Sequence, residues 1–270
     1  MNITLKGVDV RYELDGPVDD DSAPWILFSN SLTTDVTMWN GEVAQLADRF
    51  RMLRYDTRGH GETSAPDGPY SFDLLVSDVV ALMDAVGVET AHFVGLSLGG
   101  MIGLGAAIRH PERILSLTSC DARAWSPPDY AAAWIERMVI AREHGMEALV
   151  EPTIERWFTE GFRAEAANTP VLDRVRTMIR ETTVAGYTGC AEALQSHDYR
   201  DGLAGIAVPC LFMTGAADTS TPPECAREMA EAVPGAECVI VDPASHISNL
   251  ENPAQFDTAL FAHLAAVQSG

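Results

Sequence analysis

Apolar residues along the chain gather into short runs that are separated by longer amphipathic stretches. Near the N-terminus, apolar and polar residues alternate over 3–6 and 8–14, which is typical of a β-hairpin. Further short apolar runs predict buried strands at 25–28, 52–55, 92–94, 114–118, 210–213 and 238–241. Helical periodicity fills the gaps over about 36–48, 71–86, 98–109, 222–232 and 254–267. This alternation favours an α/β fold with a mostly parallel sheet.

The stretch 122–201 interrupts the alternation, because it contains no convincing strand-like run. After a turn at Trp125-Ser126-Pro127-Pro128, it shows amphipathic helices over 130–144, 146–159, 170–185 and 187–195. We therefore expect 122–201 to form a helical cap, inserted into an α/β core made of 1–121 and 202–270. The alternative is one larger continuous sheet, which needs strands that the pattern does not provide.

Composition and charge narrow the class of protein. The chain has 270 residues, and 18 Lys and Arg against 39 Asp and Glu give a net charge of −21. So acidic a surface argues against nucleic acid and anionic membranes as partners. No apolar run approaches the roughly 18 residues of a membrane span, and the first residues lack the apolar core of a secretory signal. Five cysteines without a CxxC pair suggest neither disulfides nor a zinc site, so we expect a cytoplasmic protein.

The first candidate for chemistry is the sequence Gly95-Leu96-Ser97-Leu98-Gly99. The pattern G-x-S-x-G is weak by itself, but here it follows a buried strand and opens an apolar helix. That setting is the one a nucleophile elbow requires, with a serine exposed on a sharp turn between strand and helix. Ser97 is therefore the predicted nucleophile, in preference to a plain glycine-rich turn.

A serine hydroxyl is a poor nucleophile at neutral pH and needs a base. His246 follows the last predicted strand and precedes the last helix, which places it at the same edge of the sheet as Ser97. His60 is the main alternative, but its neighbours Arg58, Gly59 and Gly61 suggest that it builds a turn. We therefore predict His246 as the base.

The base in turn needs a carboxylate that orients it. Asp218 follows the strand at 210–213 and gives the chain order Ser97, Asp218, His246, which is the order of α/β-hydrolases. Asp121 directly follows the strand when that strand is extended to 114–120, so it remains an alternative acid.

Backbone N–H groups must stabilise the oxyanion that forms during acyl transfer. One is the N–H of Leu98, the residue after the nucleophile, and the other is assigned to Leu32 in the loop after the strand at 25–28. No HExxH, GxxxxGK[ST] or strand-linked GxGxxG sequence occurs, so we expect no metal and no cofactor.

Basic residues concentrate in the predicted cap. Nine of the seventeen arginines lie between 121 and 200, where the net charge is −4 against −17 for the remainder. We hypothesise that the cap binds an anionic group of the substrate through Trp134 and Arg137, which share a helix face at i, i+3, with Trp157 as an apolar wall. The alternative is that Arg137 pairs with Glu136 or Glu143 on a solvated face. Arg123 and Arg156 are further candidates.

Together these motifs resemble the α/β-hydrolases and, within them, the 3-oxoadipate enol-lactonases. The resemblance extends over nearly the whole chain, through 30–39, 53–61, 95–103, 156–158, 186–190, 215–223 and 245–251. It implies an eight-stranded, mostly parallel sheet with a helical cap and a pocket between them. Two features depart from the family: Thr33 stands where a glycine is expected, and the stretch 120–123, with Arg123, is unusually charged. We expect both to border the pocket.

The resemblance implies a serine hydrolase that opens a small carboxylate-bearing enol-lactone through an acyl-enzyme, in bacterial aromatic catabolism. The product would be 3-oxoadipate. The alternatives are a lactonase or carboxylesterase for a bulkier ester and, in a different class, a non-hydrolytic ligand receptor of the same fold. In each case the partner is a small molecule.

Overall fold

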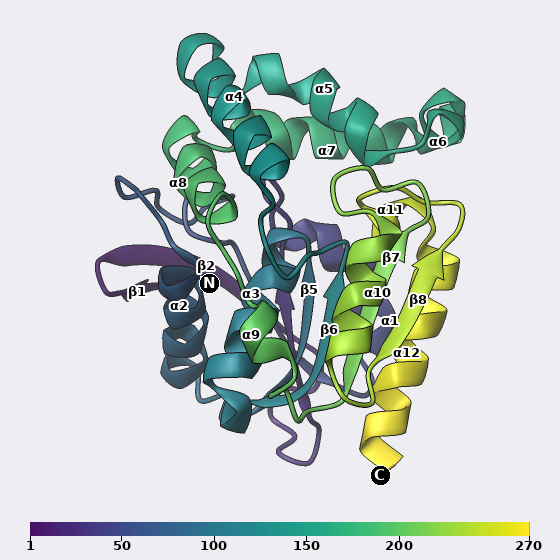
Figure 1. Cartoon of the computed structure of the whole chain (residues 1–270). Coiled ribbons are helices and arrows are strands. Elements are labelled where there is room, and N and C mark those ends of the chain that lie inside the picture. Colours follow the sequence, from purple (N-terminus) through teal and green to yellow (C-terminus); the bar gives the residue numbers. More distant parts are fainter. Residues whose placement is uncertain (270) are drawn as a thin grey trace.

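An eight-stranded sheet forms the centre of the computed structural model, which describes residues 1–269 (Figure 1). The strands lie in the order β1-β2-β4-β3-β5-β6-β7-β8. β1 pairs antiparallel with β2 and β2 with β4, whereas all other neighbours run parallel. The predicted mostly parallel α/β sheet is thereby confirmed. The strands are β1 (Asn2–Leu5), β2 (Val8–Asp15), β3 (Trp25–Ser29), β4 (Arg51–Tyr55), β5 (Ala91–Leu96), β6 (Ile114–Cys120), β7 (Cys210–Gly215) and β8 (Glu237–Val241).

The central strands are buried and mostly apolar because helices cover both faces of the sheet (Figure 1). β3, β5 and β7 have no exposed residue. The predicted helix over 36–48 is divided into a 3₁₀ turn, η1 (Val36–Trp39), and a short α1. The helices of the core are α1 (Asn40–Leu46), α2 (Phe72–Ala85), α3 (Leu98–Arg109), α9 (Arg200–Leu203), α10 (Pro223–Ala232), α11 (Ser248–Glu251) and α12 (Pro253–Ser269), with a 3₁₀ turn η2 (Pro111–Arg113).

Between β6 and β7 the chain forms a group of helices that lie above the carboxyl ends of the parallel strands (Figure 1). We call α4 to α8 the cap helices. Four of them correspond to predicted helices, with the last two beginning and ending a few residues earlier, and the five-residue α6 was not predicted. The cap helices are α4 (Pro128–His144), α5 (Glu147–Trp157), α6 (Glu160–Ala164), α7 (Thr169–Glu181) and α8 (Val184–Leu194), with a 3₁₀ turn η3 (Ala166–Asn168).

The two ends of this helical segment meet. Trp125 and Asp198 form an isolated antiparallel bridge, and the N–H of Ser126 donates to the carbonyl of His197 at 3.0 Å. The chain therefore leaves the core and returns to it at one place.

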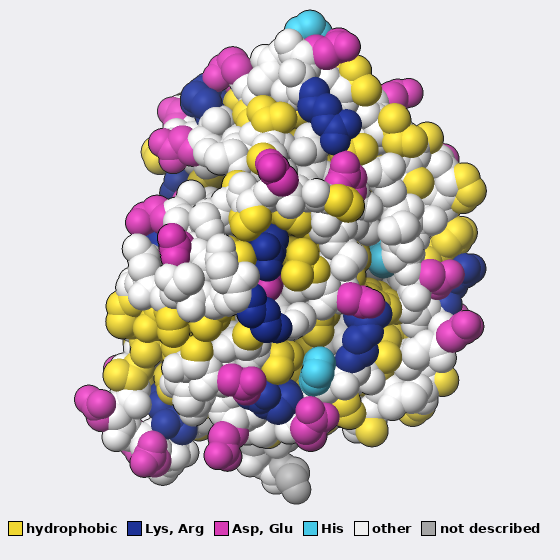
Figure 2. All heavy atoms as spheres, turned by 90° about the vertical axis from the view of Figure 1, so that its left-hand side faces the viewer, with side chains coloured by type: hydrophobic (Ala, Val, Ile, Leu, Met, Phe, Trp, Pro, Cys, Tyr) yellow, Lys and Arg dark blue, Asp and Glu magenta, His cyan; other side chains and the backbone are white. Residues whose placement is uncertain are grey.

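The surface carries the acidic charge of the sequence in dispersed form. Figure 2 shows acidic side chains scattered over one face of the molecule, with basic side chains beside several of them. Across residues 1–269, no helix combines the length and the apolar character needed to cross a membrane.

Candidate active site

Ser97 lies on a sharp turn between β5 and α3, with φ 54° and ψ −114°. Few residues other than glycine adopt a positive φ, so the surrounding structure must hold this conformation against strain. The flanking glycines leave the space that the turn needs. A Cβ on Gly95 would lie 2.3 Å from the carbonyl oxygen of Gly99, and a Cβ on Gly99 would lie 2.1 Å from that of Ser29.

The structure joins the three predicted side chains in one hydrogen-bonded chain. His246 Nε2 lies 3.0 Å from Ser97 Oγ, and His246 Nδ1 lies 2.8 Å from Asp218 Oδ2. All three side chains are buried. Since a carboxylate can only accept, Nδ1 carries the ring proton and Nε2 is left to accept from the serine hydroxyl. This is the arrangement that a serine nucleophile and its base require.

Asp218 is held by the loop that follows β7. Its Oδ1 accepts from the N–H groups of Ser220, at 2.7 Å, and Thr221, at 3.1 Å. The Thr221 hydroxyl donates to Oδ2 at 2.6 Å, beside the bond from His246. Sequence reasoning missed Thr221, although the pattern of an acid followed by hydroxyl residues in Asp218-Thr219-Ser220-Thr221 is typical of a local side-chain-to-backbone turn.

Asp121, the alternative acid, is bonded elsewhere. Its Oδ1 accepts from the N–H of Gly215 at 2.8 Å, and its Oδ2 is 2.5 Å from the hydroxyl of Ser248. Gly215 begins the loop that carries Asp218, and Ser248 follows His246 by two residues, so Asp121 ties the two loops together. Burial, and next the charge of Asp218, raise the pKa of Asp121 well above its ordinary value.

The two backbone groups predicted for the oxyanion, those of Leu32 and Leu98, are both available. Within residues 1–269 neither N–H donates to a protein acceptor. Leu98 is the first residue of α3, where N–H groups have no partner inside the helix. Thr33 has a φ of 62°, which explains why glycine was expected there, and its hydroxyl bonds to the Leu32 carbonyl at 2.6 Å.

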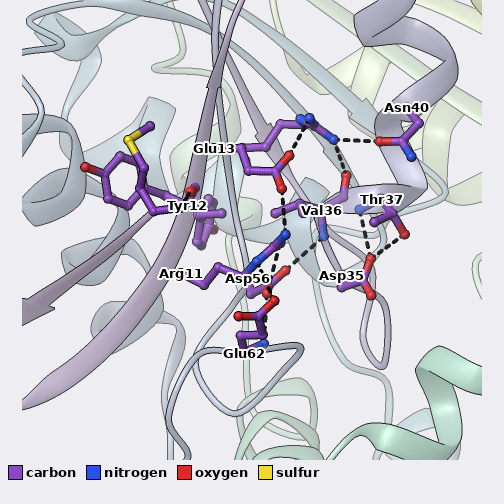
Figure 3. A network of polar contacts seen from close by, with 12 residues as sticks. Arg11, Tyr12, Glu13, Asp35, Val36, Thr37, Asn40, Asp56 and Glu62 are labelled. Carbon is purple, nitrogen blue, oxygen red and sulfur yellow. Dashed lines mark hydrogen bonds and ion pairs between the residues drawn. The ribbon is translucent and has the colours of Figure 1, made fainter.

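Charged side chains from β2 and from the end of β4 fix the loop that carries Leu32 (Figure 3). Asp56 accepts from the N–H of Val36 at 2.9 Å, and Arg54 donates to the Val36 carbonyl at 2.9 Å and to Asn40 at 2.8 Å. Arg11 lies against the same Asp56 carboxylate. Burial raises the pKa of Asp56 to about 6. The network therefore holds the start of η1, which directly follows the loop that carries Leu32.

His60, the alternative base, belongs to a buried turn. Its Nδ1 is 3.1 Å from the carbonyl oxygen of Arg58, and burial lowers its pKa to about 4. It makes no hydrogen bond to Ser97 within the described part of the chain.

A small cavity of about 10 Å³ beneath the cap borders the predicted site, and we call it the acyl cavity. This volume holds about one water molecule, so its walls must move apart to admit a lactone. The ring of Trp157 in its wall lies 5.9 Å from the ring of His246. Trp134 also lines it, and the Nε1 of Trp134 is buried without an acceptor among residues 1–269. The half-buried Arg156 also lines it, and its guanidinium donates to the Pro152 carbonyl and the Thr153 hydroxyl of the same helix, both at 3.3 Å. The lining residues are Leu32, Thr33, Trp134, Met146, Leu149, Thr153, Arg156, Trp157, Ile179 and Tyr187.

Arg137 and Arg123, the other predicted substrate-binding arginines, line a neighbouring cavity. The guanidinium of Arg137 lies 4.7 Å over the ring of Trp134, so the predicted pair is together on one helix face. Arg137 forms no ion pair with Glu136 or Glu143. Arg123 lies 4.2 Å over the ring of Tyr130.

Comparison with known proteins identifies the family of the chain. The family model described as "alpha/beta hydrolase fold" matches residues 24–253, and the chain belongs to this family of hydrolases. Within it, the chain is 34% identical over 260 residues to 3-oxoadipate enol-lactonase 2 of Acinetobacter baylyi, covering 96% of this chain and 94% of that one.

Solved structures and a more distant relative extend the comparison. The crystal structure of the enol-lactonase from Burkholderia xenovorans LB400 has a TM-score of 0.93 and 39% identity, and covers 98% of this chain and 100% of that one. The protein named "Putative carbamate hydrolase RutD" from Stutzerimonas stutzeri is 25% identical over 258 residues, which cover 95% of this chain and 97% of that one. The similarity thus includes enol-lactonases and other hydrolases.

Proposed function

We propose that the protein is a serine hydrolase that opens a small enol-lactone bearing a carboxylate, of the 3-oxoadipate enol-lactone type. The observation that carries the proposal is the hydrogen-bonded chain from Ser97 through His246 to Asp218, adjacent to a cavity with a guanidinium and a free indole N–H. A ligand receptor has no need of all three members of that chain. The similarity to enol-lactonases supports the substrate class.

In the proposed reaction, Ser97 Oγ attacks the lactone carbonyl while His246 Nε2 takes its proton. The N–H groups of Leu32 and Leu98 stabilise the oxyanion, and Asp218 stabilises the imidazolium that forms. His246 then protonates the leaving enolate, whose enol becomes a ketone, so ring opening is effectively irreversible. Water, activated by the same histidine, releases the acid from Ser97. These steps need no metal or cofactor.

The carboxylate arm of the substrate is held by the cap. Trp134 Nε1 offers an unused donor in the acyl cavity, and Arg156 supplies the charge that a carboxylate selects. Burial, and next the charge of Arg137, lower the pKa of Arg156 to about 10, so it stays charged at neutral pH. The hypothesis that Arg137 binds the arm stays a prediction. We place the reaction in the cytoplasm, in the breakdown of aromatic compounds.

The test ranks a panel of lactones and esters by kcat/KM, with and without a carboxylate. The proposal expects the carboxylate-bearing enol-lactone to rank first, and turnover to fall by several orders of magnitude in Ser97→Ala. Loss of a desolvated ion pair costs about 2–5 kcal/mol, so Arg156→Ala should lose roughly 30- to 5000-fold on the acid and little on its neutral methyl ester.

Arg137→Ala, measured in the same way, decides between the two arginines. A preference for a bulkier neutral ester would replace the substrate assignment with a carboxylesterase. Binding of an activated ester without turnover would show that the protein is a non-hydrolytic ligand receptor.

A further inference from the structure

A second cavity lies beside the acyl cavity, and three arginines line it. It has a volume of about 320 Å³, and we call it the arginine cavity. Arg123 comes from the segment after β6, Arg137 from α4 and Arg156 from α5, and Thr219 and Ser220 of the loop that carries Asp218 complete its polar wall. Arg156 lines both cavities, so the two are neighbours across one side chain.

The three guanidinium charges are not neutralised by ion pairs. Eleven of the seventeen arginines pair with a carboxylate within residues 1–269, and three of the remaining six line this cavity. Asp129 is the one carboxylate among the described lining residues, and it makes no ion pair with them. In a chain of net charge −21, this is a local excess of positive charge that no ion pair among the described residues neutralises.

Aromatic rings hold two of these arginines in place. Arg123 lies over Tyr130, Arg137 lies over Trp134, and the two rings meet edge to face with centroids 5.8 Å apart. A ring face attracts a guanidinium and fixes its plane, but it accepts none of the five N–H groups in a hydrogen bond. The arginines are therefore oriented with donors left over, which is the condition for binding an anion without a large cost in side-chain entropy.

Two residues of the wall, Arg123 and Ser220, each carry a polar atom without a partner. Arg123 Nε and Ser220 Oγ are buried and have no hydrogen-bond partner among the described residues. Buried donors are rarely left unsatisfied, because each costs about 1–3 kcal/mol. An anion with several acceptor oxygens would satisfy both.

We propose that the arginine cavity is a second anion site that binds a small dicarboxylate, and that it receives the ring-opened product. The identity of the product rests on the proposed function. Hydrolysis of a lactone that already bears one carboxylate creates another, so the product is a dianion where the substrate was a monoanion. Arg156, common to both cavities, can contact a carboxylate on either side, and the other two arginines supply the charge for the second group.

The experiment measures binding separately from catalysis, by isothermal titration calorimetry on the Ser97→Ala protein. The probe is adipate, a six-carbon dicarboxylate with no bond to hydrolyse, and hexanoate is the monocarboxylate of equal length. We expect adipate to bind more tightly than hexanoate, with an affinity that falls as NaCl is raised from 20 mM to 500 mM by about an order of magnitude or more.

Arg123 lies outside the acyl cavity, and Arg123→Gln should lower the affinity for adipate at least 10-fold. The matched control is Arg49→Gln, because Arg49 also lies over an aromatic ring, makes no ion pair among residues 1–269 and is outside both cavities. It should leave the affinity unchanged. Arg123→Lys keeps the charge but loses the planar fork, and should give an intermediate affinity. Thermal unfolding of each variant identifies any that is not folded.

Equal affinity of adipate for the Ser97→Ala protein with and without Arg123→Gln would overturn the second site. The second site would also be overturned if Arg156→Gln abolished binding while Arg123→Gln and Arg137→Gln left the affinity unchanged, since adipate would then occupy only the acyl cavity. Failure of the proposed function is distinguishable: if adipate binds as expected but no enol-lactone is hydrolysed, the substrate assignment is wrong and the anion site stands. If the enol-lactone is hydrolysed and adipate does not bind, the substrate assignment stands and the second anion site is wrong.

Discussion

Replacement of Asp218 by asparagine separates the two acids that the sequence offers for the proposed triad. Asp218 accepts four hydrogen bonds, two from backbone N–H groups and two from the side chains of Thr221 and His246. The amide oxygen of asparagine can keep both backbone bonds, and the Thr221 hydroxyl can rotate to accept from the amide nitrogen. The loop should therefore keep its conformation.

The effect of Asp218→Asn should fall on His246. Facing an amide N–H, Nδ1 becomes an acceptor and the ring proton moves to Nε2, which lies 3.0 Å from Ser97 Oγ. A protonated Nε2 cannot take the serine proton. In serine-protease triads the same change lowers kcat about 10⁴-fold, which corresponds to about 5.5 kcal/mol in the barrier.

Asp121→Asn is the matched control, because Asp121 is also a buried aspartate at the end of a strand. An asparagine there can accept from the N–H of Gly215 and donate to the hydroxyl of Ser248, so both bonds persist. Because both bonds persist and Asp121 makes no contact with His246 in the described residues, the change should cost less than about 10-fold.

The assay compares kcat on an activated ester for both variants, with thermal unfolding as a check that each is folded. If Asp121→Asn proves the more damaging change in a folded protein, the acid is Asp121 and our assignment is wrong.

Three further predictions test the site and its support. Ser97→Ala and His246→Ala should each lose several orders of magnitude in kcat, and the double variant should be scarcely worse than either; multiplicative losses would contradict a joint role. Burial raises the pKa of Glu42 from 4.5 to about 8, so the folded protein keeps a proton that the unfolded chain releases, and stability falls as the pH rises through that window. The Tm of Glu42→Gln minus the Tm of the original protein should therefore increase from pH 5 to pH 8.5. A difference that stays constant with pH would show that Glu42 is ionised in the folded protein. Gly99→Ala should cost about 3 kcal/mol in chemical denaturation, because the new Cβ would meet backbone of β3, whereas Gly41→Ala, in open space on α1, should be neutral or stabilising by up to about 1 kcal/mol.

The sheet could be predicted from the sequence because its central strands are buried on both faces. A short, continuous apolar run such as that of β3 is typical of a parallel strand covered by helices on each side. The five-residue α6 was missed since it is too short for a helical period to be visible.

Ser97, His246 and Asp218 could be predicted together because residues that follow parallel strands meet at one edge of the sheet. What the pattern does not encode is which acid faces the histidine. The bonds of Asp121 to Gly215 and Ser248 join residues 94 and 127 positions apart, and they depend on how two loops fold. For the same reason the sequence singled out Arg137, whereas Arg156 lines the acyl cavity.

The route of the chain has a consequence for how such a protein can change. The nucleophile, base and acid that we propose come from loops after β5, β8 and β7, whereas most of the acyl cavity wall comes from the helices between Trp125 and Asp198, where the chain leaves and returns. The proposed catalytic residues and most of the acyl cavity wall therefore belong to separate segments of the sequence. Mutations confined to the helical stretch can therefore accumulate, in nature or in a directed-evolution library, and alter which acyl groups are admitted while the hydrolytic apparatus is inherited intact.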